Sequence, residues 1–477
     1  MRIAIIFFLV SLTVFSFGQE THLSEYQFRS QSQIDSFSIK YPACTSIRVV
    51  IVNDTVGDIV DVSPLKQIKK VREFWIRKNP KLRKVELFND VALDSIDNFY
   101  VSENDVLDTL IVLKQTKVMV YGFEIYNDKS LYIEGLHHID SIYQWQITLP
   151  QEGVSKIKGF DNLRLGGFRA ALSGSIHLEG FNKFKKVSNL VISNNNLIKD
   201  LTQFSSLEEV TSLSLGNIKT NFKLIGVENL KTLRSLGLGN IETLENLKPI
   251  EQVRGLNRLF IFNTAINLHL KELKHVNEIN TLDLFNINGT IDFDSVTFDS
   301  IKHLVFIENE GLKHCNFSIN YLPQSFNKLN INQAGSPLYV YKVYNGNSLI
   351  LAKNPNLDFC SSKAICNLIS VIPRDEIAIE NNGSGCSELE EVEAKCIVNT
   401  DEETKNPVFI YPNPTSEYIV FENRMPKLEV FNLSGLKLFT FLNVNDLNTS
   451  TWQEGTYVIK FYDETNKTIG SQLLLKQ

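Results

Sequence analysis

The sequence predicts a mainly β protein, in which a solenoid of about 23-residue coils is followed by a small C-terminal β-sandwich. Three observations predict this fold. Apolar residues repeat at a constant spacing, cysteines gather where the repeat ends, and short strand-like runs alternate with turns over residues 408–477. Self-similarity at roughly 20 to 30 residues is typical of stacked coils that bury their apolar edges only against neighbouring coils. The composition, 43% hydrophobic and 21% charged, is that of a globular chain.

Residues 1–18 have the pattern of a secretory signal peptide. Arg2 precedes the apolar run Ile3–Phe17, and Ser16-Phe17-Gly18 offers a cleavage site with small residues. The apolar run is shorter than the ~20 residues that a membrane-spanning helix needs. We therefore expect residues 1–18 to be removed, and the mature chain to have no transmembrane segment.

The repeat is strictest between residues 190 and 290, where six apolar columns keep a spacing of 23 residues. Within one coil the columns fall three residues apart, which suits a 3₁₀-like turning path. The last two columns are two residues apart, which suits a strand. The columns are Leu201, Leu224, Leu247 and Leu270; Phe204, Val227, Ile250 and Leu273; Leu207, Leu230, Val253 and Val276; Val210, Leu233, Leu256 and Ile279; Leu213, Leu236, Leu259 and Leu282; and Leu215, Leu238, Ile261 and Leu284.

A seventh column is polar and contains Asn194, Asn217, Asn240, Asn263 and Asn286. Asparagine tolerates tight turns, and its amide can bond neighbouring groups. We interpret this column as a structural ladder along the solenoid, with no chemical role.

Less regular coils are expected on both sides of the strict repeat. They begin at Ile47–Val52 and resume after Leu284 at Leu304, Leu329, Leu349 and Ile377. The solenoid is therefore predicted to span residues 19–396, together with a disulfide-bonded cap at its C-terminal end.

The coils resemble leucine-rich repeats, although the asparagine arrives one position earlier than in the usual L-x-x-L-x-L-x-x-N pattern, as Val210 to Asn217 shows. They more closely resemble the receptor L-domain, a solenoid with irregular coils that is known from the ligand-binding ectodomains of growth-factor receptors. Similar repeats occur in secreted bacterial proteins. The resemblance covers residues 40–396 and implies an architecture rather than a particular ligand.

Four cysteines gather where the repeats stop: Cys360, Cys366, Cys386 and Cys396. In an exported protein they indicate disulfide bonds, with three possible connectivities. A zinc site is the alternative, which the spacing of Cys360 and Cys366 disfavours. The surrounding run from Asn354 to Cys396 resembles the C-terminal cap of the secreted bacterial solenoids. We expect Cys44 near an N-terminal cap and Cys315 as a buried thiol, with a bond between these two cysteines as the alternative.

Residues 397–407 are polar and are predicted to form a linker, which residues 408–477 follow as a separate domain. This domain contains Tyr411-Pro412-Asn413-Pro414, Leu428–Gly435 and Glu454-Gly455-Thr456-Tyr457. These motifs resemble the type A C-terminal sorting domain of type IX secretion, which carries cargo across a bacterial outer membrane. Two departures are Trp452, where the family often has leucine, and the ending Leu474–Gln477, which lacks paired lysines. The resemblance implies that the type IX secretion machinery is a partner, and that the protein is secreted or attached to the bacterial outer surface.

The sequence lacks the common motifs of catalytic sites. No histidine lies in H-E-x-x-H, and no phosphate-binding G-x-x-x-x-G-K-[ST] occurs. Asp292, Asp294 and Asp299 could bind a cation, but their alternation with apolar residues favours a solvated strand face. The net charge of −6 without a clustered basic face argues against nucleic acid. We therefore predict no enzyme, no catalytic residues, no cofactor and no metal.

A ligand site is predicted from side chains that should point away from the core, at positions one and three after the first strand leucine. These positions begin as Ser214 and Gly216 and become aromatic at Phe260, Phe262 and Phe285. Clustered exposed apolar side chains commonly mark interaction sites, and a covering loop is the alternative explanation. The predicted function is adhesion to, or capture of, a polysaccharide or protein ligand. The rival functions are a polysaccharide lyase or hydrolase on a β-helix and a structural surface stalk.

Overall fold

The computed structural model describes residues 22–90, 96–115, 120–127, 129–293, 296–321, 348–399, 410–411, 414–432, 435–463 and 468–477. The predicted signal peptide, most of the predicted linker and residues 412–413 of the sorting motif lie outside these ranges. The chain divides into two compact units, residues 1–394 and residues 395–477.

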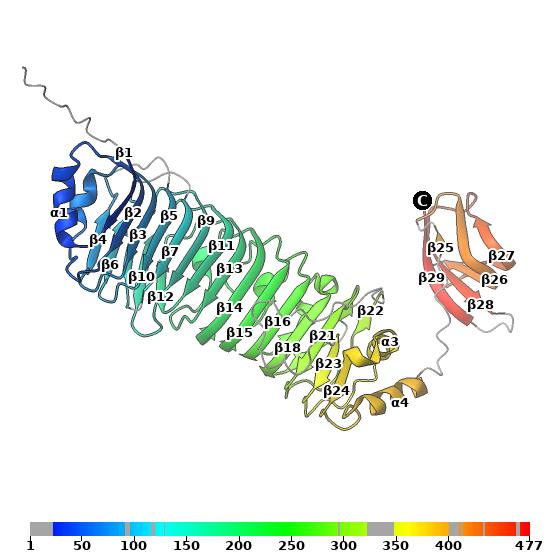
Figure 1. Cartoon of the computed structure of the whole chain (residues 1–477). Helices are drawn as coiled ribbons and strands as arrows, with labels where there is room; N and C mark the ends of the chain where they lie inside the picture. Colours follow the sequence, from blue (N-terminus) through cyan, green and yellow to red (C-terminus); the bar gives the residue numbers. More distant parts are fainter. Residues whose placement is uncertain are drawn as a thin grey trace, which may run out of the picture. The chain divides into compact units, whose positions relative to one another are not determined.

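The larger unit is a β-solenoid, as the repeat predicts (Figure 1). Among the residues that the structure describes, its main sheet is parallel and has 15 strands. The strands, in spatial order, are β1 (His22–Phe28), β2 (Ser46–Asn53), β3 (Lys70–Arg77), β5 (Ile96–Ser102), β7 (Val120–Tyr126), β9 (Ser141–Thr148), β11 (Leu165–Ser173), β13 (Lys186–Ser193), β14 (Glu209–Phe222), β15 (Ser235–Leu244), β16 (Arg258–Ala265), β18 (Thr281–Asn288), β21 (His303–Ile307), β23 (Leu349–Ala352) and β24 (Ile377–Glu380).

A second parallel sheet covers the other side of the N-terminal coils. It contains β4 (Lys84–Leu87), β6 (Thr109–Val112), β8 (Tyr132–Gly135), β10 (Ser155–Gly159) and β12 (Ile176–Glu179). Two short pairs lie in later coils: β17 (Leu268–His269) with β19 (Ile291–Asp292), and β20 (Thr297–Phe298) with β22 (Ser318–Ile319). The core lies inside the coils, so each strand buries only one face unless something covers the other.

The strict repeat follows the predicted register. Leu190, Leu213, Leu236, Leu259 and Leu282 pair in succession across the main sheet. The six predicted columns are buried, apart from the half-buried Val276. The three-apart segments contain the predicted 3₁₀ turns, namely η2 (Thr202–Phe204), η3 (Lys248–Ile250), η4 (Leu270–Glu272) and η5 (Val276–Glu278).

The N-terminal coils place aromatic rings where the strict coils place leucines. Phe74, Phe99, Phe123 and Trp145 pair in succession in the main sheet, and all four are fully buried. The rings of Phe74 and Phe99 stack at 5.8 Å, and those of Phe99 and Phe123 at 5.4 Å. Coil length varies here because turns absorb extra residues while the strands keep their pairing.

One expected coil falls on residues that the structure does not describe. The sequence predicts a strand at Leu329, which lies outside the described residues. In the main sheet, Leu304 of β21 pairs directly with Leu349 of β23.

Helical caps close both ends of the solenoid. At the N-terminal end, α1 (Gln31–Lys40) and η1 (Ser63–Gln67) lie around the first coil, and the buried Cys44 thiol donates to the Ser46 carbonyl at 3.6 Å. At the C-terminal end are α3 (Lys363–Val371), η6 (Arg374–Glu376) and α4 (Leu389–Asn399). Because α4 continues through Asn399, residues 397–399 of the predicted linker are helical.

The four clustered cysteines form two disulfide bonds. Cys360 bonds Cys386. Cys366 and Cys396 are also disulfide-bonded, which leaves them as the second pair. The two bonds overlap along the chain: the first joins the segment before α3 to the turn after β24, and the second joins α3 to α4. Cys315 is a buried thiol, as expected, and burial raises its pKa.

The smaller unit is antiparallel. Its strands are β25 (Ile410–Tyr411), β26 (Tyr418–Asn432), β27 (Lys437–Asn448), β28 (Gly455–Tyr462) and β29 (Thr468–Lys476). They pair in one five-stranded sheet around the long β26, so the described residues do not divide into the two sheets of a sandwich. Leu428, Val430, Ile459 and Leu474 are fully buried in its core. A 15-residue strand can bend and enclose its own core, and alternation alone does not distinguish this from two stacked sheets.

Candidate functional site

The outward face of the main sheet changes character along the solenoid. Its outward positions can be followed through the strand register, one coil at a time. In the N-terminal coils they are aromatic and charged, including Trp75, Tyr100 and Glu124. In the middle coils they are small, as Ser214 and Gly237 illustrate.

The predicted phenylalanine site is largely closed. Phe260 is 6% exposed and Phe285 is 1% exposed, so neither offers a surface to a ligand. Phe285 packs with Val305, Ile307, Ile350 and Ala352, which are buried on the same outward face. The half-buried Phe262 lies over Gly239, where an added Cβ would collide with its ring. The alternation of the strands places these residues outward as predicted, but outward positions in these coils are buried.

A charged group is buried beside these phenylalanines. Arg258 donates to Asp283 at 3.0 Å, and His303 Nε2 lies 3.3 Å from the other Asp283 oxygen. Burial lowers the pKa of His303, so its imidazole is neutral at neutral pH. With 4% of the Asp283 and His303 side chains exposed, this group is closed to ligands in this structure.

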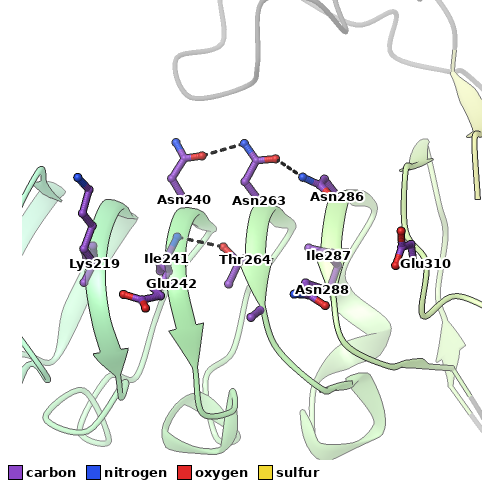
Figure 2. A pocket seen from close by; sticks show the side chains of 12 residues that line it. Lys219, Asn240, Ile241, Glu242, Asn263, Thr264, Asn286, Ile287, Asn288 and Glu310 are labelled. Carbon is purple, nitrogen blue, oxygen red and sulfur yellow. Dashed lines mark hydrogen bonds between the residues drawn. The ribbon is translucent and has the colours of Figure 1, made fainter.

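The asparagine column forms a hydrogen-bonded ladder. Asn217, Asn240, Asn263 and Asn286 each donate through Nδ2 to the Oδ1 of the preceding asparagine, at 2.8 to 2.9 Å. All five asparagines have left-handed backbones, with φ from 44° to 55°. Figure 2 shows three of them at the rim of an open groove of about 630 Å³. Because the ladder amides bond one another, they act mainly as structural turn residues.

The acidic cluster is held by neighbouring side chains. Asp292 lies 3.3 Å from His269 and 3.4 Å from Lys271, and Asp299 accepts from Asn277 and Asn320. Asp294 lies outside the described residues. Among the residues that the structure describes, no group of three His, Cys, Asp or Glu side chains could hold a metal ion.

The strongest candidate site lies on β3, β5 and β7. We define the aromatic patch as Trp75, Tyr100, Glu124 and Tyr126, which are half-buried outward-facing residues of these three strands. The rings of Trp75 and Tyr100 lie 4.9 Å apart at 40°, and those of Tyr100 and Tyr126 lie 5.8 Å apart at 46°. Half-buried tilted rings present apolar faces together with polar tips.

Polar groups orient the rings of the aromatic patch. Trp75 Nε1 donates to Glu73 at 3.3 Å, and the Tyr126 hydroxyl donates to Glu124 at 3.3 Å. Gln144 donates to the other Glu124 oxygen at 3.4 Å. Burial, followed by the Glu124 carboxylate, raises the pKa of Tyr126. The phenol therefore stays neutral at physiological pH, and the patch combines apolar rings with carboxylates and amides.

The sequence contained a signal for this patch. The alternation rule that was applied from Leu213 onward also applies to Phe74-Trp75-Ile76 and Phe99-Tyr100-Val101. In each triplet the outer residues are buried and the central ring points outward. Because the coil spacing is irregular here, the spacing alone does not align these strands with the strands of the strict coils.

The predicted sorting-motif residues lie at strand ends and turns of the smaller unit. Tyr411 ends β25, Gly435 occupies the turn before β27 with a φ of 83°, and Gly455 begins β28. Tyr457 is buried and its hydroxyl donates to the Gln453 carbonyl at 2.7 Å. Pro414 is exposed. These residues shape the sheet rather than gathering in one pocket.

Comparison with known families identifies this unit. Residues 409–476 match the family described as the secretion system C-terminal sorting domain, a type IX sorting tail. The protein is therefore exported by type IX secretion, is secreted or attached to the cell surface, and interacts with the secretion machinery through this tail. No curated protein matches the chain. Within the described ranges, no helix is long and apolar enough to cross a membrane.

Proposed function

We propose that this protein is an extracellular binding module, in which the solenoid holds a polysaccharide or protein ligand and the tail provides export. The observation that carries the proposal is the aromatic patch, where Trp75, Tyr100 and Tyr126 face outward beside Glu73 and Glu124. Clusters of outward-facing aromatic side chains favour interaction surfaces over solvent.

Binding is favoured over the two rival functions, an enzyme and a stalk. The carboxylates of the aromatic patch are held by hydrogen bonds from Trp75, Tyr126 and Gln144, which suits fixed recognition groups better than proton transfer. A passive stalk has no need for tryptophan and tyrosine rings on a strand face that could carry small polar residues, as the middle coils do.

We further propose that the solenoid is of the leucine-rich-repeat or receptor L-domain type. The flanking coils support this, because Leu349, Leu351 and Asn354 fit L-x-L-x-x-N. Asn354 is buried and donates to Asn382 at 2.8 Å and to the Phe306 carbonyl at 2.9 Å. In the four coils whose strands begin at Glu209, Ser235, Arg258 and Thr281, isoleucine or threonine takes this position, and the preceding asparagine belongs to the exposed ladder instead. The type A assignment of the tail is likewise a proposal, supported by Gly455 and Tyr457 in β28.

The test is a binding screen of the chain without residues 1–18 against polysaccharides and extracellular proteins. Once a saturable ligand is found, Trp75→Ala and Tyr100→Ala should each weaken binding about tenfold, on the scale of an aromatic contact. Phe262→Ala is the matched control, because Phe262 is a half-buried outward aromatic residue of the originally predicted site. If only the Phe262 variant lost binding, the ligand site would lie on the C-terminal coils rather than at the aromatic patch. A folded protein without any saturable ligand would favour the stalk, and product release from a polysaccharide would favour the enzyme.

A further inference from the structure

A second aromatic cluster lies beside the aromatic patch, at the beginning of β7 and β9 and within β11. We define the aromatic shelf as Tyr121, Tyr143 and Phe168, which are 52%, 41% and 53% exposed. The rings of Tyr121 and Tyr143 stack at 4.7 Å with an angle of 12°. Leu165 is exposed next to them. Single exposed aromatic residues are ordinary, but a cluster of rings on adjacent strands is typical of a contact surface.

The fold positions the shelf by interrupting a strand. The register of β11 against β9 shifts between Gly166 and Arg169, and this irregularity projects Phe168 into solvent. Asn189 of the next strand donates to the Phe168 carbonyl at 2.9 Å, which holds the irregular segment in place. Bulges commonly redirect side chains next to binding sites.

A glycine gives one ring its place. A Cβ at Gly167 would lie 2.6 Å from Cδ2 of Tyr143, so any larger residue would displace this ring. The Tyr143 ring therefore lies against the backbone of β11. Its stacking with Tyr121 continues the surface onto β7.

An open groove of about 500 Å³ lies along the shelf. Besides Tyr143 and Phe168 it is lined by Ser188, Thr211 and Thr232, and by the ion pair between Lys186 and Glu209 at 2.5 Å. The Lys186 side chain is 58% exposed and the Glu209 side chain is 50% exposed. The groove thus combines aromatic faces with hydroxyl groups and with one cation and one anion.

This combination fits a sugar ring. A pyranose has one face of C–H groups, which stacks on an aromatic ring, and a rim of hydroxyls that both donate and accept hydrogen bonds. Lys186 can donate, Glu209 can accept, and the serine and threonine hydroxyls can do both. Nucleic acid would need an excess of positive charge along the groove, whereas Lys186 is paired with Glu209. Because the groove is open to solvent rather than enclosed, it can accept part of a longer chain.

We propose that the aromatic shelf is a subsite for an uncharged glycan chain, with one sugar ring stacked on Tyr143 and Phe168 and its hydroxyls bonded by Lys186 and Glu209. This inference rests on the proposed function, because it names the ligand class of the same N-terminal coils.

The test uses the full chain without residues 1–18 and soluble xylan, mannan, β-glucan, α-glucan and chitin oligosaccharides as probes, with binding measured by calorimetry and by retardation in polysaccharide-containing gels. At least one probe should bind saturably. Tyr143→Ala and Phe168→Ala should each weaken it about tenfold, and Phe168→Trp should retain or strengthen it because the ring is kept. Tyr321→Ala is the matched control, since Tyr321 is exposed elsewhere on the solenoid, and it should leave binding unchanged.

Three outcomes overturn the inference, and they separate it from the proposed function. Glycan binding that survives both alanine variants but fails in Trp75→Ala rejects the shelf and retains the aromatic patch. A protein ligand that depends on Trp75, with no glycan bound, rejects the ligand class alone. The absence of any ligand for the folded chain rejects both. Circular dichroism of each variant separates lost binding from lost structure.

Discussion

Asn263 lies in the middle of the exposed ladder, where one substitution removes two defined interactions. Its Nδ2 donates to Asn240 at 2.8 Å, and its Oδ1 accepts from Asn286 at 2.9 Å. Its backbone has a φ of 47°, in the left-handed region. Asn263→Ala removes both bonds and leaves a side chain that is poorly suited to this backbone, whereas Asn263→Gly removes the bonds alone.

The expected magnitudes follow from these contacts. The bonds are exposed, so each contributes about 0.5 kcal/mol, at the lower end of the usual net range. The left-handed conformation costs alanine about 1 kcal/mol more than asparagine or glycine. Asn263→Ala should therefore lower the free energy of unfolding by about 2 kcal/mol, and Asn263→Gly by about 1 kcal/mol.

Urea unfolding of the chain without residues 1–18, followed by far-ultraviolet circular dichroism, measures both variants. Glu242→Ala, an exposed neighbour outside the ladder, is the control and should change stability by less than about 0.5 kcal/mol. Equal losses in the alanine and glycine variants would refute the conformational part of the argument. No loss in either would refute the contribution of the ladder itself.

Three further predictions concern the cap, the coils and the tail. Replacing Cys360 and Cys386 by serine removes a bond that closes a loop with a sequence separation of 26. The free energy of unfolding should fall by about 3.5 kcal/mol, because the unfolded chain is no longer constrained. Urea unfolding measures this change, and an unchanged midpoint would contradict it. Gly159→Ala would drive a Cβ into the Gly135 carbonyl, so it should cost more than about 3 kcal/mol or prevent soluble expression. Gly435→Ala is the control, because a Cβ at Gly435 would have open space around it, and it should lower the free energy of unfolding by about 1 kcal/mol. If the two variants had comparable soluble yields and unfolding midpoints, the close approach of Gly159 to the Gly135 carbonyl would not limit stability. In the tail, the hydrogen bond from Tyr462 lowers the pKa of Glu429, with further lowering by Lys427 and Lys437. This carboxylate therefore stabilises the tail fully above its unfolded pKa of about 4.3, and the stabilisation is lost as the pH falls through the lower folded pKa. Glu429→Gln should accordingly flatten the fall in thermal midpoint between about pH 5 and pH 3, and parallel curves for the two proteins would count against the pairing.

The strict coils could be predicted because their burial is set locally. The strand alternation that buries Leu213 and Leu215 also turns Ser214 outward, and the 23-residue spacing repeats this arrangement in each coil. The asparagine column could also be predicted from the sequence, because the same left-handed turn recurs at one position of each coil. In the N-terminal coils variable turn lengths interrupt the spacing, so the spacing alone does not reveal Trp75 and Tyr100, although their strands follow the same alternation.

Alternation could not show whether an outward side chain is exposed. Phe260, Phe262 and Phe285 point outward as predicted, yet Phe260 and Phe285 are buried, because residues distant in sequence decide what packs on that face. The connectivity of the four cysteines was open for a similar reason. A disulfide depends on which side chains meet in space, and spacing along the chain left three solutions.

The sequence by itself therefore determined the coil, its in-and-out alternation, the asparagine ladder and the export tail, since each is encoded in residues that are close together or regularly repeated. The tertiary structure decided which outward face is open, where the aromatic patch and shelf lie, that β21 pairs directly with β23, and that the tail forms one sheet. These features depend on contacts between distant segments, and no local pattern of apolar and polar residues specifies such contacts.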